Sequence, residues 1–254
     1  MLSSQFVSRV SLLRERVASF DAYPFCLPAL RDFKQLDLHP RMTILVGENG
    51  SGKSTLLEAI AVALGLNAEG GSKNFSFGTR NSHSVLANYL RLSKGIRKPR
   101  TSYFLRAESF FNVATEIEKL DAEPAYSPPV IDSYGGISLH EQSHGESFMA
   151  LLCHRFDADG LYLFDEPEAA LSPQRQLAAL ARIHDLICEG SQFIMAIHSP
   201  ILMAYPDAQI YQLSQSGIEK IAYQDTEHYQ VTRDFLLHPE RMLKILMDRN
   251  QDDN

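Results

Sequence analysis

A glycine-rich segment between two apolar runs constrains the fold of this chain more than any other feature. Residues 42–46, M-T-I-L-V, form a short apolar run with β-branched members, which predicts a buried strand. The letters G-E-N-G-S-G-K-S-T follow at 47–55, and residues 56–64 predict a helix that Gly65 ends. This order of strand, loop and helix is the context in which G-x-x-x-x-G-K-[ST] forms a phosphate-binding P-loop.

Each residue type in this loop has a physical role in holding phosphate. Glycines permit backbone angles that residues with a Cβ resist, so the N–H groups of the loop can point inward around phosphate oxygens. The N-terminus of the following helix adds about half an elementary positive charge. Lys53 places a cation near the β- and γ-phosphates, and the hydroxyl of Ser54 can ligate Mg²⁺. We therefore expect nucleotide contacts from the whole loop, namely Gly47, Glu48, Asn49, Gly50, Ser51, Gly52, Lys53, Ser54 and Thr55.

A second apolar run supplies a carboxylate for the metal. Residues 161–164 predict a buried strand, and Asp165 lies at its carboxyl end, where ligands bind in open parallel sheets. We expect Asp165 to hold Mg²⁺, directly or through water, and Glu166 to polarise the attacking water. An adjacent Asp-Glu pair is common on ordinary surfaces, but this pair ends an apolar strand and precedes a proline.

A third apolar run ends in a histidine. Residues 193–197 predict another buried strand, and His198 follows it directly. At the carboxyl edge of a sheet, this imidazole could contact the γ-phosphate and help to orient the water. A single histidine is more often structural, and it is the series of motifs that favours a functional role. Lys53, Glu166 and His198 are the predicted catalytic residues.

Together these segments resemble the ATP-binding cassette (ABC) superfamily over about residues 42–200. G-E-N-G-S-G-K-S-T resembles the Walker A motif of that family, and L-Y-L-F-D-E resembles its Walker B motif with the following glutamate. E-A-A-L-S-P stands where the family has its D-loop, and His198 matches the switch histidine. The resemblance implies an α/β fold of the P-loop NTPase class, with a RecA-like parallel sheet of ABC-ATPase type and a small helical subdomain.

The same resemblance gives a meaning to the segment Q-S-H-G-E. In the family a signature, usually L-S-G-G-Q, lies shortly before the Walker B aspartate, and Ser143 stands at that place. By this match Ser143 is the signature serine, Gly145 is its second glycine and Glu146 replaces its final glutamine. Gln142 and His144 depart from the pattern, since they replace the leucine and the first glycine.

The signature implies a partner. In the family it caps the nucleotide held by another subunit, so the resemblance implies a homodimer, formed on ATP binding, that encloses two ATP molecules. The letters S-F-M-A-L-L-C-H-R-F predict an amphipathic helix that begins near Ser147. Its N-terminus would add to the anion-binding surface of the signature.

Other positions favour the soluble SMC-, RecF- and OLD-like branch of the family. The letters L-L-E-A after the Walker A motif resemble that branch, and the interval before the signature is too short for a coiled-coil arm. The glutamine loop of the family has no clear counterpart, because the predicted strand T-S-Y-F-L-R-A-E-S-F offers Arg106 and Glu108 instead. Tyr23 and Phe25 are candidates for stacking on the adenine.

Composition limits the remaining function classes. The 254 residues are 44% hydrophobic and 22% charged, which suits one ATPase domain over 1–254 with a helical and signature subdomain at about 84–156. No apolar run approaches the roughly 18–20 residues that span a bilayer, so we expect no membrane insertion. Three scattered cysteines without metal-ligand spacing favour a reducing, cytoplasmic setting.

Charge and motif spacing leave minor alternatives. The net charge of −7 argues against a whole chain that binds polyanions. The basic residues of 91–100 favour a solvated loop, with contact to nucleic-acid phosphates as the alternative. A metal site at His140, Glu141 and His144 is a weaker interpretation, because their spacing is not that of H-E-x-x-H. No G-x-S-x-G nucleophile elbow is present.

The remaining segments give expectations for secondary structure. Phe6, Val10, Leu13 and Val17 fall on one face of an expected N-terminal helix. Further helices are expected at 84–93, 112–120, 226–237 and 239–248, and a short one after His198. A hairpin is expected around Ser216-Gly217, and loops are expected at 67–83 and 121–138. The residues after 249 are expected to be disordered.

The combined interpretation is a cytoplasmic, Mg²⁺-dependent ATPase that acts as a nucleotide-dependent switch. Its output would be DNA repair or phage defence, either directly on DNA or through an effector protein. Two other classes remain open. One is the energising subunit of a transporter, and the other is a module that senses ATP without turning it over.

Overall fold

The computed structural model describes residues 5–72, 85–107, 110–122 and 128–248. A mixed sheet of seven strands runs through it in the order β10-β9-β3-β8-β7-β6-β4. The pairs β9/β3, β3/β8, β8/β7 and β7/β6 are parallel, and the outermost pair at each edge is antiparallel. The strands are β3 (Met42–Val46), β4 (Gly71–Ser72), β6 (Thr101–Arg106), β7 (Gly160–Asp165), β8 (Gln192–Ala196), β9 (Gln209–Ser214) and β10 (Gly217–Ile221).

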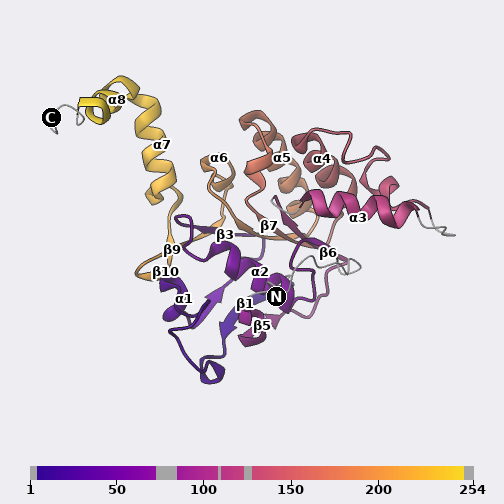
Figure 1. The fold of residues 1–254 in the computed structure, drawn as a ribbon, viewed down its shortest axis with the longest axis horizontal. Helices are drawn as coiled ribbons and strands as arrows, with labels where there is room; N and C mark the ends of the chain where they lie inside the picture. The colour runs from indigo at the N-terminus through magenta and orange to yellow at the C-terminus, as the bar shows by residue number, and fades with distance from the viewer. Residues whose placement is uncertain (1–4, 73–84, 108–109, 123–127, 249–254) are drawn as a thin grey trace.

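Helices cover both faces of this sheet (Figure 1). On one face lie α3 (Phe110–Ala122), α4 (His144–Ala150), α5 (Pro173–Cys188) and α6 (Pro200–Met203). On the other face lie α1 (Pro28–Arg31), α2 (Lys53–Ala63) and a smaller antiparallel sheet in the order β2-β1-β5, made of β1 (Val7–Leu12), β2 (Gln35–Asp37) and β5 (Leu90–Lys94). The predicted α/β fold with a parallel-rich sheet is confirmed.

The central strands are buried on both faces, which explains their continuous apolar runs. In β3, Ile44 and Val46 belong to the core beneath α3–α6, whereas Leu45 belongs to the core beneath α2 and the small sheet. The strands expected at 42–46, 161–164 and 193–197 are all present, with shifts of one residue at most. The expected hairpin around Ser216-Gly217 joins β9 to β10.

The prediction of an N-terminal helix is wrong. Residues Val7–Leu12 form β1, which pairs with β2 on one side and β5 on the other. Val10 and Leu12 are buried and alternate with the less buried Ser11, which is the period of a strand. The helical spacing was a coincidence of four apolar residues, and pairing on both sides favours the extended form.

Two further expectations between the P-loop and β6 are also wrong. Residues 85–89 form a short 3₁₀ helix and Leu90–Lys94 form β5, in place of a helix over 84–93. Gly71–Ser72 pair with β6 as β4 inside the expected loop of 67–83. Residue 84 and the rest of that loop from 73 lie outside the described residues.

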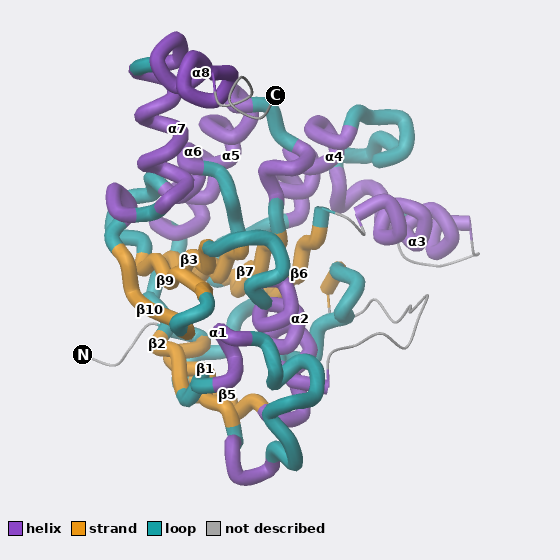
Figure 2. The backbone as a smooth tube through the Cα atoms, turned by 60° about the vertical axis from the view of Figure 1, so that its left-hand side comes forward, coloured by secondary structure: helices purple, strands orange, loops and turns teal. Residues whose placement is uncertain are grey.

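The expected helices at 112–120, 226–237 and 239–248 are present as α3, α7 (Glu227–Leu237) and α8 (Pro239–Asp248). Figures 1 and 2 show α7 and α8 extending away from the sheet, so that the last described residues lie far from the body. Much of their apolar surface is exposed, including Leu236 and Leu246. Among the described residues, no helix combines the length and apolarity that crossing a membrane would require.

A single buried side chain joins the two sheets. Gln192, at the start of β8, is almost fully buried. Its carbonyl oxygen accepts from the backbone N–H groups of Phe6 and Val7, at 3.0 and 3.1 Å. Its amide nitrogen donates to the carbonyls of Val7 and His39, at 2.8 and 3.0 Å. Three of these hydrogen bonds hold the N-terminal segment against the main sheet, and the fourth holds the chain just before β3.

We expect Gln192→Leu to lower the free energy of unfolding by at least about 2 kcal/mol, because buried groups left unpaired cost about 1–3 kcal/mol each. Urea unfolding monitored by circular dichroism measures the effect. Gln174→Leu is the matched control, since Gln174 is exposed on α5 and should change stability by less than about 0.5 kcal/mol. Equal losses in the two variants would contradict the joining role of Gln192.

Candidate functional site

The P-loop connects β3 to α2 at the carboxyl edge of the main sheet. Gly47 has φ +146°, and a Cβ there would lie 2.3 Å from the carbonyl oxygen of Leu213 in β9, so only glycine fits. Gly52 stands just before α2 with φ +99°, in the left-handed region. The loop therefore turns tightly against β9, and the first turn of α2 faces the site.

Lys53 is buried at the centre of this loop. Its Nζ donates to the carbonyl of Gly47 at 2.7 Å and to that of Glu48 at 2.9 Å. Burial lowers the pKa of Lys53, and the neighbouring carboxylates of Glu166 and Asp165 partly oppose this effect. A cation that the loop itself holds in place is suited to binding phosphate oxygens.

Ser54 and Asp165 meet although they are far apart in the sequence. The hydroxyl of Ser54 donates to Oδ1 of Asp165 at 2.8 Å, and Asp165 is buried at the end of β7. A hydroxyl and a carboxylate are oxygen ligands of the kind that Mg²⁺ takes, usually with phosphates and water filling its other positions. The donor set therefore fits Mg²⁺ bound together with a nucleotide.

Arg106 adds a positive charge to the predicted metal site. The β6–β7 register places it directly opposite Asp165. Its Nε lies 3.5 Å from Oδ2 of Asp165, and its Nη1 donates to Oε2 of Glu58 in α2 at 2.8 Å. Arg106 stands at the expected place of the glutamine loop. Its guanidinium links Asp165 at the end of β7 to Glu58 of α2. Glu108, the other residue considered there, lies outside the described residues.

Glu166 and His198 lie side by side at the ends of β7 and β8. Glu166 adopts φ +50° and its backbone N–H donates to the carbonyl of Ala196 at 2.9 Å. Its Oε1 lies 3.5 Å from Nε2 of His198. That nitrogen is buried and has no hydrogen-bond partner among the described residues, so it is available to donate or accept in the site.

Two residues that the sequence did not indicate hold His198. Oε1 of Glu168 accepts from the backbone N–H of His198, and from that of Ser199 at 3.2 Å. Nδ1 of His198 lies 2.9 Å from Nε2 of His228 in α7. Burial, followed by the charge of Lys53, lowers the pKa of both histidines. Glu168 opens the segment that resembles the D-loop, but no role was predicted for it, and no spacing pointed to His228.

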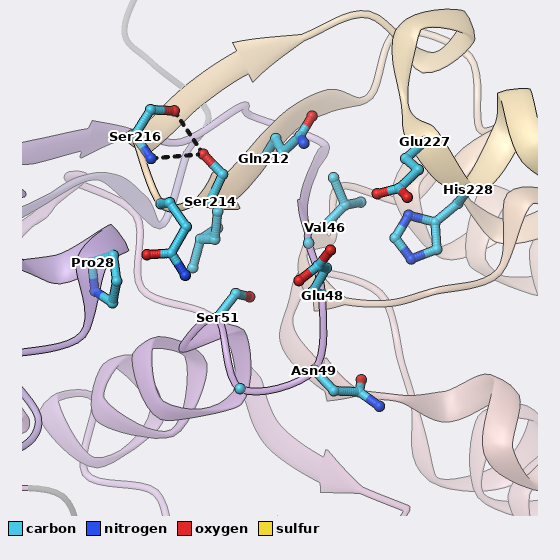
Figure 3. Close-up of a pocket in the computed structure, with 14 residues that line it drawn as sticks. Pro28, Val46, Glu48, Asn49, Ser51, Gln212, Ser214, Ser216, Glu227 and His228 are labelled. Carbon is cyan, nitrogen blue, oxygen red and sulfur yellow. Dashed lines mark hydrogen bonds between the residues drawn. The ribbon is translucent and has the colours of Figure 1, made fainter.

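Two hollows flank the P-loop. One, of about 390 Å³, lies between the loop and the β9–β10 hairpin, and Figure 3 shows Glu227 and His228 on its α7 side with their side chains directed toward Val46 and Glu48. The other, of about 440 Å³, is lined by Lys53, Ser54, Thr55, Glu166 and Tyr23 among others. The second hollow thus brings together P-loop residues, including the predicted metal ligand Ser54, and Glu166.

The two aromatic candidates differ in position. Tyr23 is 64% exposed beside the second hollow, and its hydroxyl lies 3.2 Å from Oγ1 of Thr55. Phe25 is 5% exposed and packs edge-on against Phe20 and Tyr89. Only Tyr23 is therefore placed to reach a base, and Phe25 belongs to the core.

The predicted signature begins α4. Ser143 is the N-cap, so the helix starts at His144 and not near Ser147 as expected. Glu146 closes a capping box: its Oε2 accepts from the hydroxyl of Ser143 at 2.6 Å and from the backbone N–H of Ser143 at 2.9 Å. The N-cap chemistry of Ser143 was present in the sequence and outweighed the apolar pattern that begins later.

Arg175 of α5 joins the signature to the segment after β7. Its Nη1 donates to Oγ of Ser143 and its Nη2 to Oε1 of Glu146, both at 3.2 Å. The hydroxyl and backbone of Ser143, together with Arg175, lower the pKa of Glu146. A Cβ on Gly145 would lie 2.3 Å from Nη1 of Arg175 and 2.9 Å from the carbonyl oxygen of Ala170, so glycine permits this close contact.

The structure adds no support for a nucleic-acid contact at 91–100 or for a metal site around His140. In the basic segment 91–100, Arg97 pairs with Asp159. His140 lies 3.1 Å from the hydroxyl of Thr115, within a local polar contact. Over the described ranges 5–72, 85–107, 110–122 and 128–248, no three His, Cys, Asp or Glu side chains gather as metal ligands.

Comparisons with known proteins place the fold. A family model described as "AAA domain" matches residues 18–120. The structure is similar to that of a transporter assigned to the metal-chelate type of ABC transporters, in an inward-facing conformation, with a TM-score of 0.50 and 16% identity over 90% of this chain and 88% of that one. This chain has the fold of an ABC ATPase domain. The fold that the motifs indicated is therefore confirmed.

Two other similar structures have lower scores. The SMC head domain from Thermotoga maritima has a TM-score of 0.47 and 15% identity, covering 86% of this chain and 100% of that one. A nucleotide-free ATP-binding cassette from an ABC transporter has a TM-score of 0.49 and 17% identity, covering 84% of this chain and 90% of that one. No curated protein matches the sequence.

The pKa of Glu168 predicts that the stability of this domain depends on pH. Burial raises the pKa of Glu168. The N–H groups of His198 and Ser199 stabilise the charged carboxylate and lower the pKa, but their effect is smaller than that of burial. A raised folded pKa means that the folded state binds the proton more tightly, so this contribution to stability is complete at low pH. It is lost as pH rises from the unfolded value of about 4.3 through the folded pKa.

We expect Glu168→Gln to remove the loss of stability at rising pH, because glutamine does not titrate. Its amide oxygen can still accept hydrogen bonds from the N–H groups of His198 and Ser199. The stability of the variant relative to the parent should therefore increase as pH rises through the raised pKa, as measured by urea unfolding at several pH values in EDTA. Glu168→Met lacks the acceptor and should be less stable than Glu168→Gln by about 1–3 kcal/mol at every pH. A constant difference between parent and Glu168→Gln would contradict the argument.

Proposed function

We propose that this domain binds ATP with Mg²⁺ and hydrolyses it, and that two copies close around two nucleotides as a switch. One observation carries the first part: a lysine, a serine, two carboxylates and a histidine converge at the carboxyl ends of three neighbouring parallel strands. The Ser54–Asp165 contact of 2.8 Å and the Glu166–His198 distance of 3.5 Å define that convergence.

In this proposal the P-loop N–H groups and Lys53 bind the phosphates, and Ser54 and Asp165 hold Mg²⁺. The metal supplies Lewis-acid charge stabilisation at the phosphoryl oxygens. Oε1 of Glu166 accepts a hydrogen bond from the attacking water and thereby orients and polarises it. Nε2 of His198 donates to an oxygen of the γ-phosphate, and Tyr23 lies where a base could stack.

The exposure of the signature supports the second part. The start of α4 exposes Ser143, His144 and Glu146. The ribbon of Figure 1 and the tube of Figure 2 both place α4 apart from α2. A second copy could therefore present its own bound nucleotide to Ser143, while the buried Gly145 lets the signature pack closely against Arg175. Glu146 would repel that phosphate, and we propose that Arg175 offsets this charge from its position against Glu146.

The finer assignments are also proposals. We propose one ATPase domain over 1–254, whose signature part includes α3 and α4. The L-L-E-A sequence of the soluble branch supports an output in DNA repair or defence through an effector protein. Affinity purification with an ATP-locked variant would identify that effector, or a membrane permease if the output is transport.

Glu166→Gln should bind Mg²⁺-ATP but turn it over at least about 100-fold more slowly, because it loses the group that polarises water. The uncleaved nucleotide should hold two copies together, which doubles the mass seen by light scattering. Lys53→Ala is the comparison variant, and it should neither bind ATP nor change in mass. Glu166→Gln that remains monomeric with ATP bound would refute the shared site.

Ser143→Arg should prevent this dimer and leave ATP binding to the monomer intact, because a long side chain would fill the surface offered to the partner. The test is light scattering of Glu166→Gln with and without the second substitution, alongside nucleotide affinity. Ser133→Arg is the matched control, since Ser133 is exposed outside the signature. Loss of ATP affinity with Ser143→Arg would place the signature in its own nucleotide site instead.

A further inference from the structure

Helix α7 begins at the proposed ATP site, and its residue His228 lies 30 residues after His198, where the ABC motifs end. Two anchors fix its first turn. Thr226 is the buried N-cap, and its hydroxyl accepts from the N–H of Tyr229 at 3.4 Å and donates to the carbonyl of Tyr223 at 2.7 Å. The hydroxyl of Tyr223 donates to the carbonyl of Pro200, which lies just after His198, at 3.0 Å.

These anchors present His228 directly to His198. The Nδ1–Nε2 distance is 2.9 Å, and the ring centroids are 5.1 Å apart with the planes inclined at 57°. In Figure 3, His228 and Glu227 point from α7 toward the P-loop strand. The first turn of α7 therefore forms one wall of the hollow beside the loop.

The chemistry of His198 restricts how this pair shares its protons. A neutral imidazole carries one proton, on either Nδ1 or Nε2. Burial and Lys53 lower the pKa of both histidines, which favours two neutral rings. If Nε2 of His198 is to donate to a phosphate oxygen, its Nδ1 must accept, and Nε2 of His228 must then be the donor between the rings.

We propose that His228 is a positioning residue for ATP hydrolysis, whose Nε2–H fixes the orientation and tautomer of His198. This inference rests on the proposed ATPase function. The nitrogen of His198 that faces Glu166 then carries the proton and can donate to the γ-phosphate. The same contact makes α7, most of which extends beyond the body of the domain, part of the hydrolysis site (Figure 1).

The test uses two substitutions of nearly equal size. Glutamine at 228 can place an amide N–H where Nε2 now lies, and methionine cannot. We expect His228→Met to lower kcat for Mg²⁺-ATP about 10- to 100-fold, by analogy with the range for residues that orient metal-ligating histidines. KM should stay within about twofold, and His228→Gln should restore most of kcat. Gln230→Met is the control on the exposed side of the same helix and should keep the kcat of the parent.

The outcomes separate the two proposals. A parent protein that turns over ATP while His228→Met has the same kcat overturns the role of His228 alone. A parent without turnover overturns the proposed function and the inference with it. Equal losses in His228→Gln and His228→Met would show that shape and not the donor matters, which also overturns the inference.

A measurement on the unsubstituted protein avoids the risk that a variant misfolds. Long-range ¹H–¹⁵N NMR spectra distinguish the two neutral histidine tautomers, and the signal of His198 can be assigned by its loss in His198→Gln. We expect the tautomer with the proton on Nε2 for His198. Observation of the proton on Nδ1 would overturn the proposal whatever the kinetics of the variants.

Discussion

The parallel pairing of β3, β8 and β7 is the constraint on which the proposed site depends. Because these strands run in one direction and are paired in register, their carboxyl ends meet at one edge of the sheet. Asp165 stands beside Ala196, and Ala196 beside Leu45, one residue before the end of β3. Motifs more than a hundred residues apart therefore come within hydrogen-bond distance, as Ser54 and Asp165 do.

Charge balance explains how so many ionisable groups share this edge. Lys53 lies near the carboxylates of Glu166, Asp165 and Glu168, and Arg106 neutralises part of Asp165 and Glu58. Isolated charges are costly to bury, and both cations here interact with carboxylates. Lys53 is further held by two P-loop carbonyls, which a phosphate could replace as partners because they are neutral acceptors. The site is thus arranged for an anionic ligand accompanied by a cation.

The sequence predicted the strands and loops of this edge well because their signals are local. The apolar runs before Gly47, Asp165 and His198 are buried on both faces. A strand of this kind can be recognised from its own apolar sequence, without knowledge of the strands that pair with it. The prediction of a helix at the N-terminus was wrong for the opposite reason. Val7–Leu12 is extended because β2, β5 and the side chain of Gln192 bind its backbone, and all three are distant in the sequence. No local pattern could supply that information.

The same distinction applies to the site residues. The P-loop and the Asp165-Glu166 pair follow from motifs, whereas His228 reaches His198 only because Tyr223 and Thr226 anchor α7 beside it. Arg106 was noted as a departure from a family pattern, but its ion pair with Asp165 follows from the β6–β7 register. The start of α4 at Ser143 was available in principle, since a serine followed three residues later by glutamate is a capping box.

A single segment, residues 165–175, contacts Ser54, His198 and the predicted signature. Asp165 contacts Ser54, which we propose as a ligand of Mg²⁺, and Glu168 holds the backbone of His198. Further along, the carbonyl of Ala170 lies against Gly145, and Arg175 binds Ser143 and Glu146. A shift of this segment when the γ-phosphate leaves would therefore move the switch histidine and the signature together. Such a connection gives a physical route by which hydrolysis in one site could release the surface offered to the partner copy.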